Sequence, residues 1–161
     1  MSFLDNLCVV KSKDRKGAID EIIFNCRTFK NLSNLNKFEK AVLIREKLGS
    51  TEIGHSVVVT HGKMEGVHNA HASLGISKEG IKWPSGNIIH FIFVFASNPL
   101  RYDLYVKKIS AILCLFHYPE LREELLSLKD DFFAMNYEEI MAKKDKYDSN
   151  LIQLIKYLNE Y

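Results

Sequence analysis

The sequence has little of what marks several large protein classes, and each shortage excludes one of them. It has only 3 prolines and 8 glycines in 161 residues and no low-complexity run, which argues against disordered, collagen-like or linker-rich chains. Its 3 cysteines, Cys8, Cys26 and Cys114, form no CxxC and leave one thiol unpaired in any disulfide scheme. We therefore expect a reducing, cytoplasmic environment.

Long apolar runs and an excess of charge are also missing. The longest apolar stretch, Ile88 to Ala96, is about a strand long and contains His90, well short of the roughly 18 residues of a membrane helix. Asp5 precedes the first basic residues, the reverse of a secretory signal. Lys and Arg total 22 against 20 for Asp and Glu, a net charge of +2. This balance favours neither nucleic acid nor an acidic membrane as a partner. Because the apolar stretches are short and the N-terminus does not resemble a secretory signal, we expect a soluble, unprocessed chain.

The spacing of apolar residues predicts helices followed by strands and then more helices. A three- and four-residue period predicts helices over Asp14–Lys30, capped by Asp14, and over Asn36–Leu48, with Asn36 as N-cap and Gly49 as a left-handed stop. Further helices are predicted over 101–116, 120–128 and 136–144, and residues 151–158 form an apolar stripe in the tail.

Three strands are predicted between these helices. They cover Val57–Val59, ending at 60–62, then Val67–Ser77, and Ile88–Phe95. A short extended piece and a turn at 80–86 separate the last two strands. The strand at 88–95 is apolar on both faces apart from His90, so it should lie in the centre of the sheet. The element order predicts an α/β fold, specifically an α+β sandwich of a sheet flanked by helices.

Histidine is the one abundant reactive residue type, and four of the six histidines, His55, His61, His68 and His71, lie within seventeen positions. His61 follows a short apolar strand and precedes Gly62, which places an imidazole where the backbone can approach a ligand closely. With an ordinary pKa near 6.5, such a group suits nucleophilic or proton-transfer chemistry. The alternative is a surface histidine beside a turn.

The same segment offers two alternative ligand sites. Gly49 and Gly54 have the glycine spacing of a P-loop, but His55-Ser56 stands where Lys-Ser/Thr should follow, and a helix precedes where a strand is needed. A zinc site from His68 and His71 with His55 or His61 lacks a carboxylate or thiolate of usual spacing. We therefore expect neither a P-loop nor a metal centre.

Arg45 is the cation best placed to serve a phosphate near this loop. It lies in the last turn of the second predicted helix, and a guanidinium holds phosphate oxygens bidentately. The alternative is that Arg45, Glu46 and Lys47 simply form a solvated helix end.

Residues 43–54, LIREKLGSTEIG, and 57–63, VVVTHGK, resemble the fructose/mannitol/nitrogen class of IIA components of the bacterial phosphoenolpyruvate-dependent sugar phosphotransferase system. That family pairs an Arg-Glu stretch, a hydroxyl residue and a glycine with a short apolar strand ending in Pro-His-Gly. The resemblance covers residues 5 to 143. It implies a mannitol-type IIA-like fold with a mixed sheet. The IIA domain would cover residues 1–143, followed by a helical extension at 144–161. We expect the apolar stripe of this extension to cover the domain's own core.

The resemblance also implies a phosphotransferase role and a site. His61 would take a phosphoryl group from phospho-HPr and pass it to a cysteine of a IIB component, with no cofactor and with a membrane involved only through a IIC transporter. Arg45 would hold phosphate oxygens, and the regions of Thr51 and Gly62 would complete the pocket.

Two departures from the family pattern stand out. Thr60 replaces the proline before the active histidine. The second histidine that usually opens the helix after the central strand is absent, with Arg101 and Tyr102 in about its place. His55 would then be the substitute, from the opposite side of the pocket. Three functions stay open: a sugar phosphocarrier of the fructose/mannitol class, a nitrogen-type regulatory protein whose His61 phosphorylation controls binding to a target, and a degenerate domain without phosphotransfer.

Overall fold

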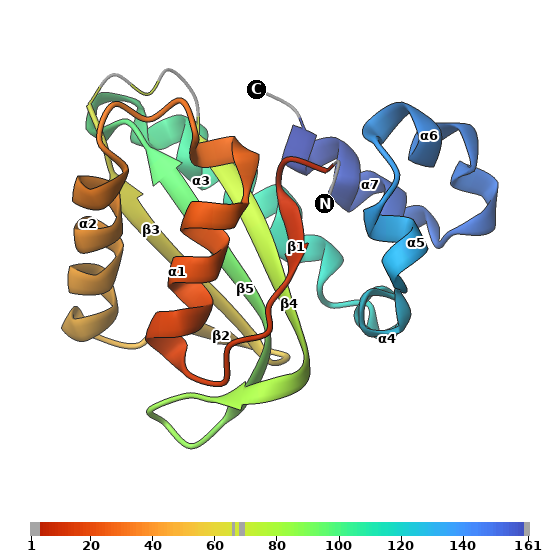
Figure 1. Cartoon of the computed structure of the whole chain (residues 1–161), viewed down its shortest axis with the longest axis horizontal. Coiled ribbons are helices and arrows are strands. Elements are labelled where there is room, and N and C mark those ends of the chain that lie inside the picture. Colours follow the sequence, from red (N-terminus) through yellow and green to blue (C-terminus); the bar gives the residue numbers. More distant parts are fainter. Residues whose placement is uncertain (1–3, 66, 68–69, 160–161) are drawn as a thin grey trace.

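The computed structural model of the chain describes residues 4–65, 67 and 70–159, and its framework over those residues is a five-stranded mixed sheet (Figure 1). The strands are β1 (Leu7–Val9), β2 (Glu52–Gly54), β3 (Val57–Lys63), β4 (His71–Lys82) and β5 (Ile88–Ser97). They lie in the order β1-β4-β5-β3-β2, with β1–β4 and β5–β3 parallel and the other two pairs antiparallel. The central position predicted for residues 88–95 is confirmed.

One face of the sheet is covered by the first helices of the chain, α1 (Arg15–Asn25), η1 (Arg27–Phe29) and α2 (Leu35–Leu48) (Figure 1). Asp14 caps α1 as predicted, accepting a hydrogen bond from the Gly17 amide at 2.8 Å. The predicted cap of α2 is wrong by two residues, since Asn34 accepts from the Lys37 amide. Gly49 is not left-handed either: its φ of 160° and ψ of 173° are extended, because the chain runs straight on toward β2.

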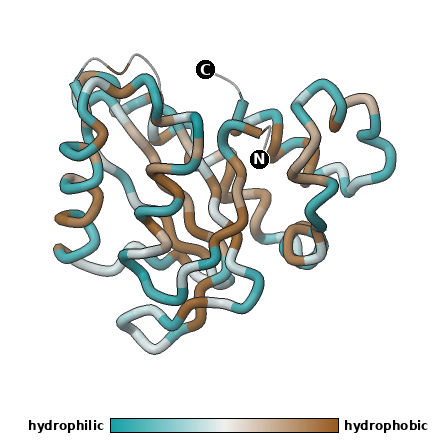
Figure 2. The backbone as a smooth tube through the Cα atoms, viewed as in Figure 1, coloured by the Kyte–Doolittle hydropathy of each residue, from teal (hydrophilic) through white to brown (hydrophobic). Residues whose placement is uncertain are grey.

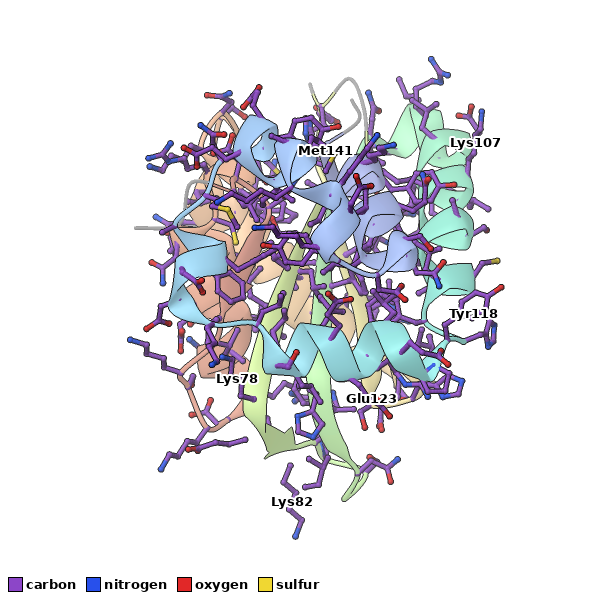
Figure 3. The ribbon with its side chains drawn as sticks, turned by 90° about the vertical axis from the view of Figure 1, so that its right-hand side faces the viewer. Lys78, Lys82, Lys107, Tyr118, Glu123 and Met141 are labelled. Atoms are coloured by element: carbon purple, nitrogen blue, oxygen red, sulfur yellow. The ribbon has the colours of Figure 1, made fainter. Side chains whose placement is uncertain are left out.

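The other face is covered by the later helices, which Figure 3 shows in front of the strands. They are η2 (Pro99–Arg101), α3 (Tyr102–Leu115), α4 (Pro119–Ser127), α5 (Asp130–Phe133), α6 (Tyr137–Ala142), η3 (Lys144–Lys146) and α7 (Ser149–Asn159). The apolar stripe of α7 is buried in the same core cluster as the inner residues of β4 and β5, as predicted for the tail. The buried Asn6 side chain donates to the Leu158 carbonyl at 2.5 Å, which ties the start of the chain to α7.

Hydrophobic residues concentrate in the strands and on the inner sides of the helices, so the two cores lie on opposite faces of one sheet (Figure 2). The pattern follows the two-residue period of strands: Phe91, Phe93 and Phe95 face the α3 side, and Ile92 and Val94 face the α1 side. No helix among the described residues is long and apolar enough to cross a membrane.

The strands differ from the sequence prediction mainly in length. β3 does not stop at Thr60 but continues through Lys63, because β5 offers paired backbone groups as far as Ser97. β4 begins at His71 and runs through the predicted turn at Gly80, with a register shift against β5 between Ile76 and Ile81. β1 and β2 were not predicted, since three residues are too few to show alternation.

Candidate functional site

His61 lies within β3, near the strand's C-terminal end, rather than beyond it. The residue pairs with Phe95 of β5 and is half-buried. Val57 and Val59 belong to the core on the α3 side, so alternation points the His61 side chain toward α3 as well. Thr60, where the family has proline, is extended and fully buried. It keeps the amide that proline lacks, and the strand runs on past the histidine.

Two tyrosines from the first turn of α3 lie against His61. The Tyr105 and His61 ring centroids are 4.8 Å apart with planes inclined by 34°, and the Tyr102 ring is 6.5 Å away. Phe95 supports Tyr105 edge-on at 5.2 Å. Tyr102 was among the predicted site residues. Tyr105 was not among them, although its three-residue spacing from Tyr102 at the start of a predicted helix was a signal that both face one neighbour.

Lys63 is a further neighbour that the sequence reasoning missed. It lies two residues after His61 on β3, and its ammonium is 5.6 Å from the centroid of the Tyr102 ring. Residues two apart on a strand share a face, so the period of β3 was a signal for its position. A cation therefore sits on the Tyr102 side of His61 as well.

Arg45 brings a free cation to this edge of the sheet. Its guanidinium donates to the Gly49 carbonyl at 3.3 Å and forms no ion pair with any described residue. β2 pairs only with the start of β3, at Val57 and Val58, so no described strand covers the edge of β3 beside His61. The Arg45 charge acts on both His61 and Tyr105 from that side.

The environment keeps His61 neutral. Burial lowers the pKa of His61 below its usual value near 6.5, and the positive charges of Arg45 and Lys63 lower it further. Burial, with Tyr102 beside it, raises the pKa of Tyr105 to about 12, although Arg45 opposes this rise. At neutral pH the site therefore holds an imidazole with a free lone pair, a protonated phenol and two cations.

Gly62 allows α2 to approach β3. A Cβ atom at this position would lie 2.8 Å from Cε1 of Phe38 and 3.1 Å from a methyl of Val42, both on α2. Only a residue without a side chain fits here unless those neighbours move. Gly62 thus sets the distance between α2, which carries Arg45, and β3, which carries His61.

Thr51 and Arg101 are engaged elsewhere. The Thr51 hydroxyl donates to the Glu46 carboxylate at 2.6 Å, and both residues are buried, so Glu46 does not belong to the solvated helix end considered above, whereas Lys47 is exposed. Arg101 donates to the exposed Asp103 at 3.2 Å and 3.3 Å. The structure places neither side chain in contact with His61.

His55 is not brought to His61. It lies in the turn between β2 and β3 with a φ of 53°, and its ring packs edge-on against His117 at 5.6 Å. The strand from Val57 to His61 spans about 13 Å. His55 is therefore not the substitute second histidine that the sequence suggested. The neighbour of His61 at the start of α3 is instead a pair of tyrosines.

The zinc alternative finds no ligand set among the described residues, which contain no group of three or more His, Cys, Asp or Glu side chains placed to hold a metal ion. His68, one of its proposed ligands, lies outside the described residues. His71 opens β4, where burial and the Lys108 charge lower its pKa.

Comparison with known proteins places this arrangement in a family. The chain is 27% identical over 124 residues to the PTS system fructose-specific EIIABC component of Bacillus subtilis, a match that covers 76% of this chain. The chain spans only 20% of that relative's length.

Two solved structures share the fold. Nitrogen regulatory protein IIA-Ntr from Neisseria meningitidis superposes with a TM-score of 0.67 at 22% identity, covering 86% of this chain and 92% of that one. The mannitol enzyme IIA of Escherichia coli, in its complex with phosphorylated enzyme IIB, gives 0.56 at 18% identity, covering 76% and 94%. Residues 3–137 match the family described as phosphoenolpyruvate-dependent sugar phosphotransferase system, EIIA 2, and the chain belongs to that family.

Proposed function

We propose that the chain is a phosphocarrier IIA component that accepts a phosphoryl group on His61 from phospho-HPr and passes it to a IIB component for uptake of a sugar of the fructose/mannitol class. The observation that carries the proposal is the neutral, half-buried imidazole of His61 beside the unpaired guanidinium of Arg45. Membership of the EIIA 2 family supports phosphoryl transfer as the reaction, and the fructose-specific relative from Bacillus subtilis supports a role in sugar uptake.

The proposed step is an in-line transfer between two imidazoles. A lone pair on a His61 ring nitrogen attacks phosphorus and forms a P–N bond, the P–N bond of the donor phosphohistidine breaks, and the donor ring keeps that electron pair. The donor ring takes up one proton, and His61 releases one from its other ring nitrogen, so the exchange balances. A protonated His61 has no such lone pair, so the lowered pKa favours the reactive form at neutral pH.

Arg45 and Lys63 would act on the transferring group. Negative charge is spread over three phosphoryl oxygens in the transition state, and a guanidinium is shaped to hold two of them. Tyr105 shields one side of the His61 ring, which limits water at the nitrogen and strengthens the electrostatic attraction. Thr51 has its hydroxyl occupied by Glu46, so its part in the pocket would be to hold the end of α2.

The test is phosphorylation in a reconstituted system. The protein is incubated with phosphoenolpyruvate, Enzyme I and HPr, and its intact mass and the acid lability of the product are measured. We expect one acid-labile phosphoryl group on the wild type and on His55→Ala, whose side chain is remote, and none on His61→Ala. Phosphorylation of His61→Ala to the wild-type level would overturn the assignment.

A second function, regulation of the nitrogen type, is favoured by the likeness to IIA-Ntr from Neisseria meningitidis. It uses the same His61 but needs no IIB acceptor. Phospho-protein that transfers its group to the cysteine of a cognate IIB supports the sugar carrier; phospho-protein that binds a target in a phosphorylation-dependent way, with no transfer, supports the regulator. A folded protein that takes no phosphoryl group while HPr is phosphorylated would be the degenerate domain.

A further inference from the structure

Two cysteines that are far apart in the sequence meet beneath α1. Cys8 lies on β1 in register with Gly75 of β4 and packs against the core on the α1 side. Cys26 is the C-cap of α1, is 3% exposed and belongs to the same core. Both the amide and the hydroxyl of Thr28 donate to the Asp5 carbonyl, at 3.0 Å and 2.8 Å. The chain after α1 is thereby fixed alongside the start of β1.

The two thiols are neighbours in this core and differ in character. The Cys26 thiol and burial raise the pKa of Cys8 well above its usual value, and the Cys8 thiol lowers the pKa of Cys26. The fully buried Ser73 hydroxyl adds to the lowering of the Cys26 pKa. Cys26 is thus the better nucleophile and Cys8 the proton donor beside it.

We propose that Cys8 and Cys26 form a thiol-oxidation site, at which a hydroperoxide such as hydrogen peroxide converts the pair reversibly into a disulfide. The site does not depend on the proposed phosphocarrier function. β4 and β5 separate β1 from β3, which puts the pair on the order of 14 Å across the sheet from the strand that carries His61.

The chemistry takes two steps. The Cys26 thiolate attacks one peroxide oxygen, the O–O bond breaks, and the departing hydroxide takes a proton to become water, leaving a sulfenic acid on Cys26. The Cys8 sulfur then attacks the Cys26 sulfur, the S–S bond forms, the S–O bond breaks, and a second water leaves. In sum, two thiols lose two electrons and two protons, and one peroxide is reduced to two waters.

The fold favours this pairing over others. Cys8 is partly exposed on an edge strand, so a small oxidant can reach the adjoining Cys26 from this edge, whereas Cys26 itself is sheltered from larger thiol reagents. Cys114 is exposed on α3, a helix that packs on the opposite face of the sheet. Because both side chains face the same core, their rotation can bring the two sulfurs to the S–S bond length of about 2.05 Å.

The experiment uses the full chain carrying Cys114→Ser, so that two thiols remain. The folded protein is treated with hydrogen peroxide, quenched, unfolded and alkylated. We expect the number of alkylatable thiols to fall from two to zero and to return to two after dithiothreitol. Trypsin should release the peptides 1–11 and 17–27 joined by a disulfide, and the melting temperature of the oxidised protein should rise by several degrees.

Two controls keep the proposal falsifiable. Cys8→Ser in the same background removes the resolving thiol, so the linked peptides should vanish and a sulfenic or sulfinic product should appear on Cys26. The wild type, treated identically, should yield the same linked peptides with Cys114 outside the link, which covers the case in which a variant does not fold. The proposal is overturned if both thiols stay alkylatable at peroxide concentrations that oxidise a model dithiol, or if they oxidise to sulfinic acid without linking.

Discussion

The rings of His61 and Tyr105 lie with centroids 4.8 Å apart and planes inclined by 34°, so a phenol from α3 covers one side of the imidazole that β3 presents. Burial raises the pKa of this tyrosine to about 12 and lowers the pKa of His61. The same contact therefore keeps the phenol protonated and the imidazole neutral. The two charged residues that act on His61, Arg45 and Lys63, are both cations.

Arg45→Met should raise the pKa of His61 toward 6.5, because Arg45 lowers this pKa more than the other cation, Lys63, does. Lys63→Met should raise it by a smaller amount. The measurement is an NMR titration of the His61 imidazole carbon and proton signals. Lys47→Met, two residues along the same helix and without an effect on His61, is the control. An unchanged or lower His61 pKa in Arg45→Met would contradict the assignment of its charge to this site.

The free energy of unfolding should fall as pH drops below about 6.5. The pKa values of His61 and His71 are both lowered in the folded protein, so below that pH the unfolded chain binds more protons than the native one. The loss begins near the unfolded value and levels off below the folded ones. Urea unfolding at pH 7.5 and pH 5.0 measures it, and His61→Gln and His71→Gln should each reduce the difference. If the difference between the two pH values is as large in both variants as in the wild type, other groups cause the loss of stability.

Gly62→Ala should destabilise the fold by about 1–3 kcal/mol, because the new methyl would lie 2.8 Å from the Phe38 ring and push α2 from β3. Gly49→Ala is the matched control: no atom lies within 4 Å of its Cβ position and its φ of 160° suits any residue, so it should change stability by less than about 0.5 kcal/mol. Chemical unfolding of both variants gives the comparison. Equal stability would mean that α2 adjusts without cost.

Leu154→Ala should cost about 2–5 kcal/mol, because the side chain is fully buried in the core between α7 and the sheet. Leu100→Ala removes the same atoms from a side chain that is 89% exposed and should be nearly neutral. Thermal or urea unfolding separates the two. If Leu154→Ala is also neutral, α7 is an appendage rather than part of the domain core, and the proposed division at residue 143 gains support.

Residue patterns within short segments of the sequence predicted much of the fold. The unbroken apolar run of residues 88–95 predicted the central strand, and Asp14 predicted the start of α1, because both depend on neighbours in the sequence. β1 and β2 could not be predicted, because each has only three residues and forms a strand only by pairing with β4 or β3. The cap of α2 was misplaced because Asn34 and Asn36 are chemically alike and only the path of the chain distinguishes them.

The sequence by itself determined the family, through the spacing of Arg45, Gly54 and His61, and with it the reaction class that we propose. It also determined that residues 88–95 form a strand buried on both faces, because an unbroken apolar run is a local property. Tertiary structure decided what surrounds His61. Tyr105 lies against its ring, His55 lies beyond the other end of β3, and the Thr51 hydroxyl donates to Glu46. It also brought Cys8 to Cys26. These contacts join separate elements, and only the packing of helices on the sheet fixes which of their side chains meet.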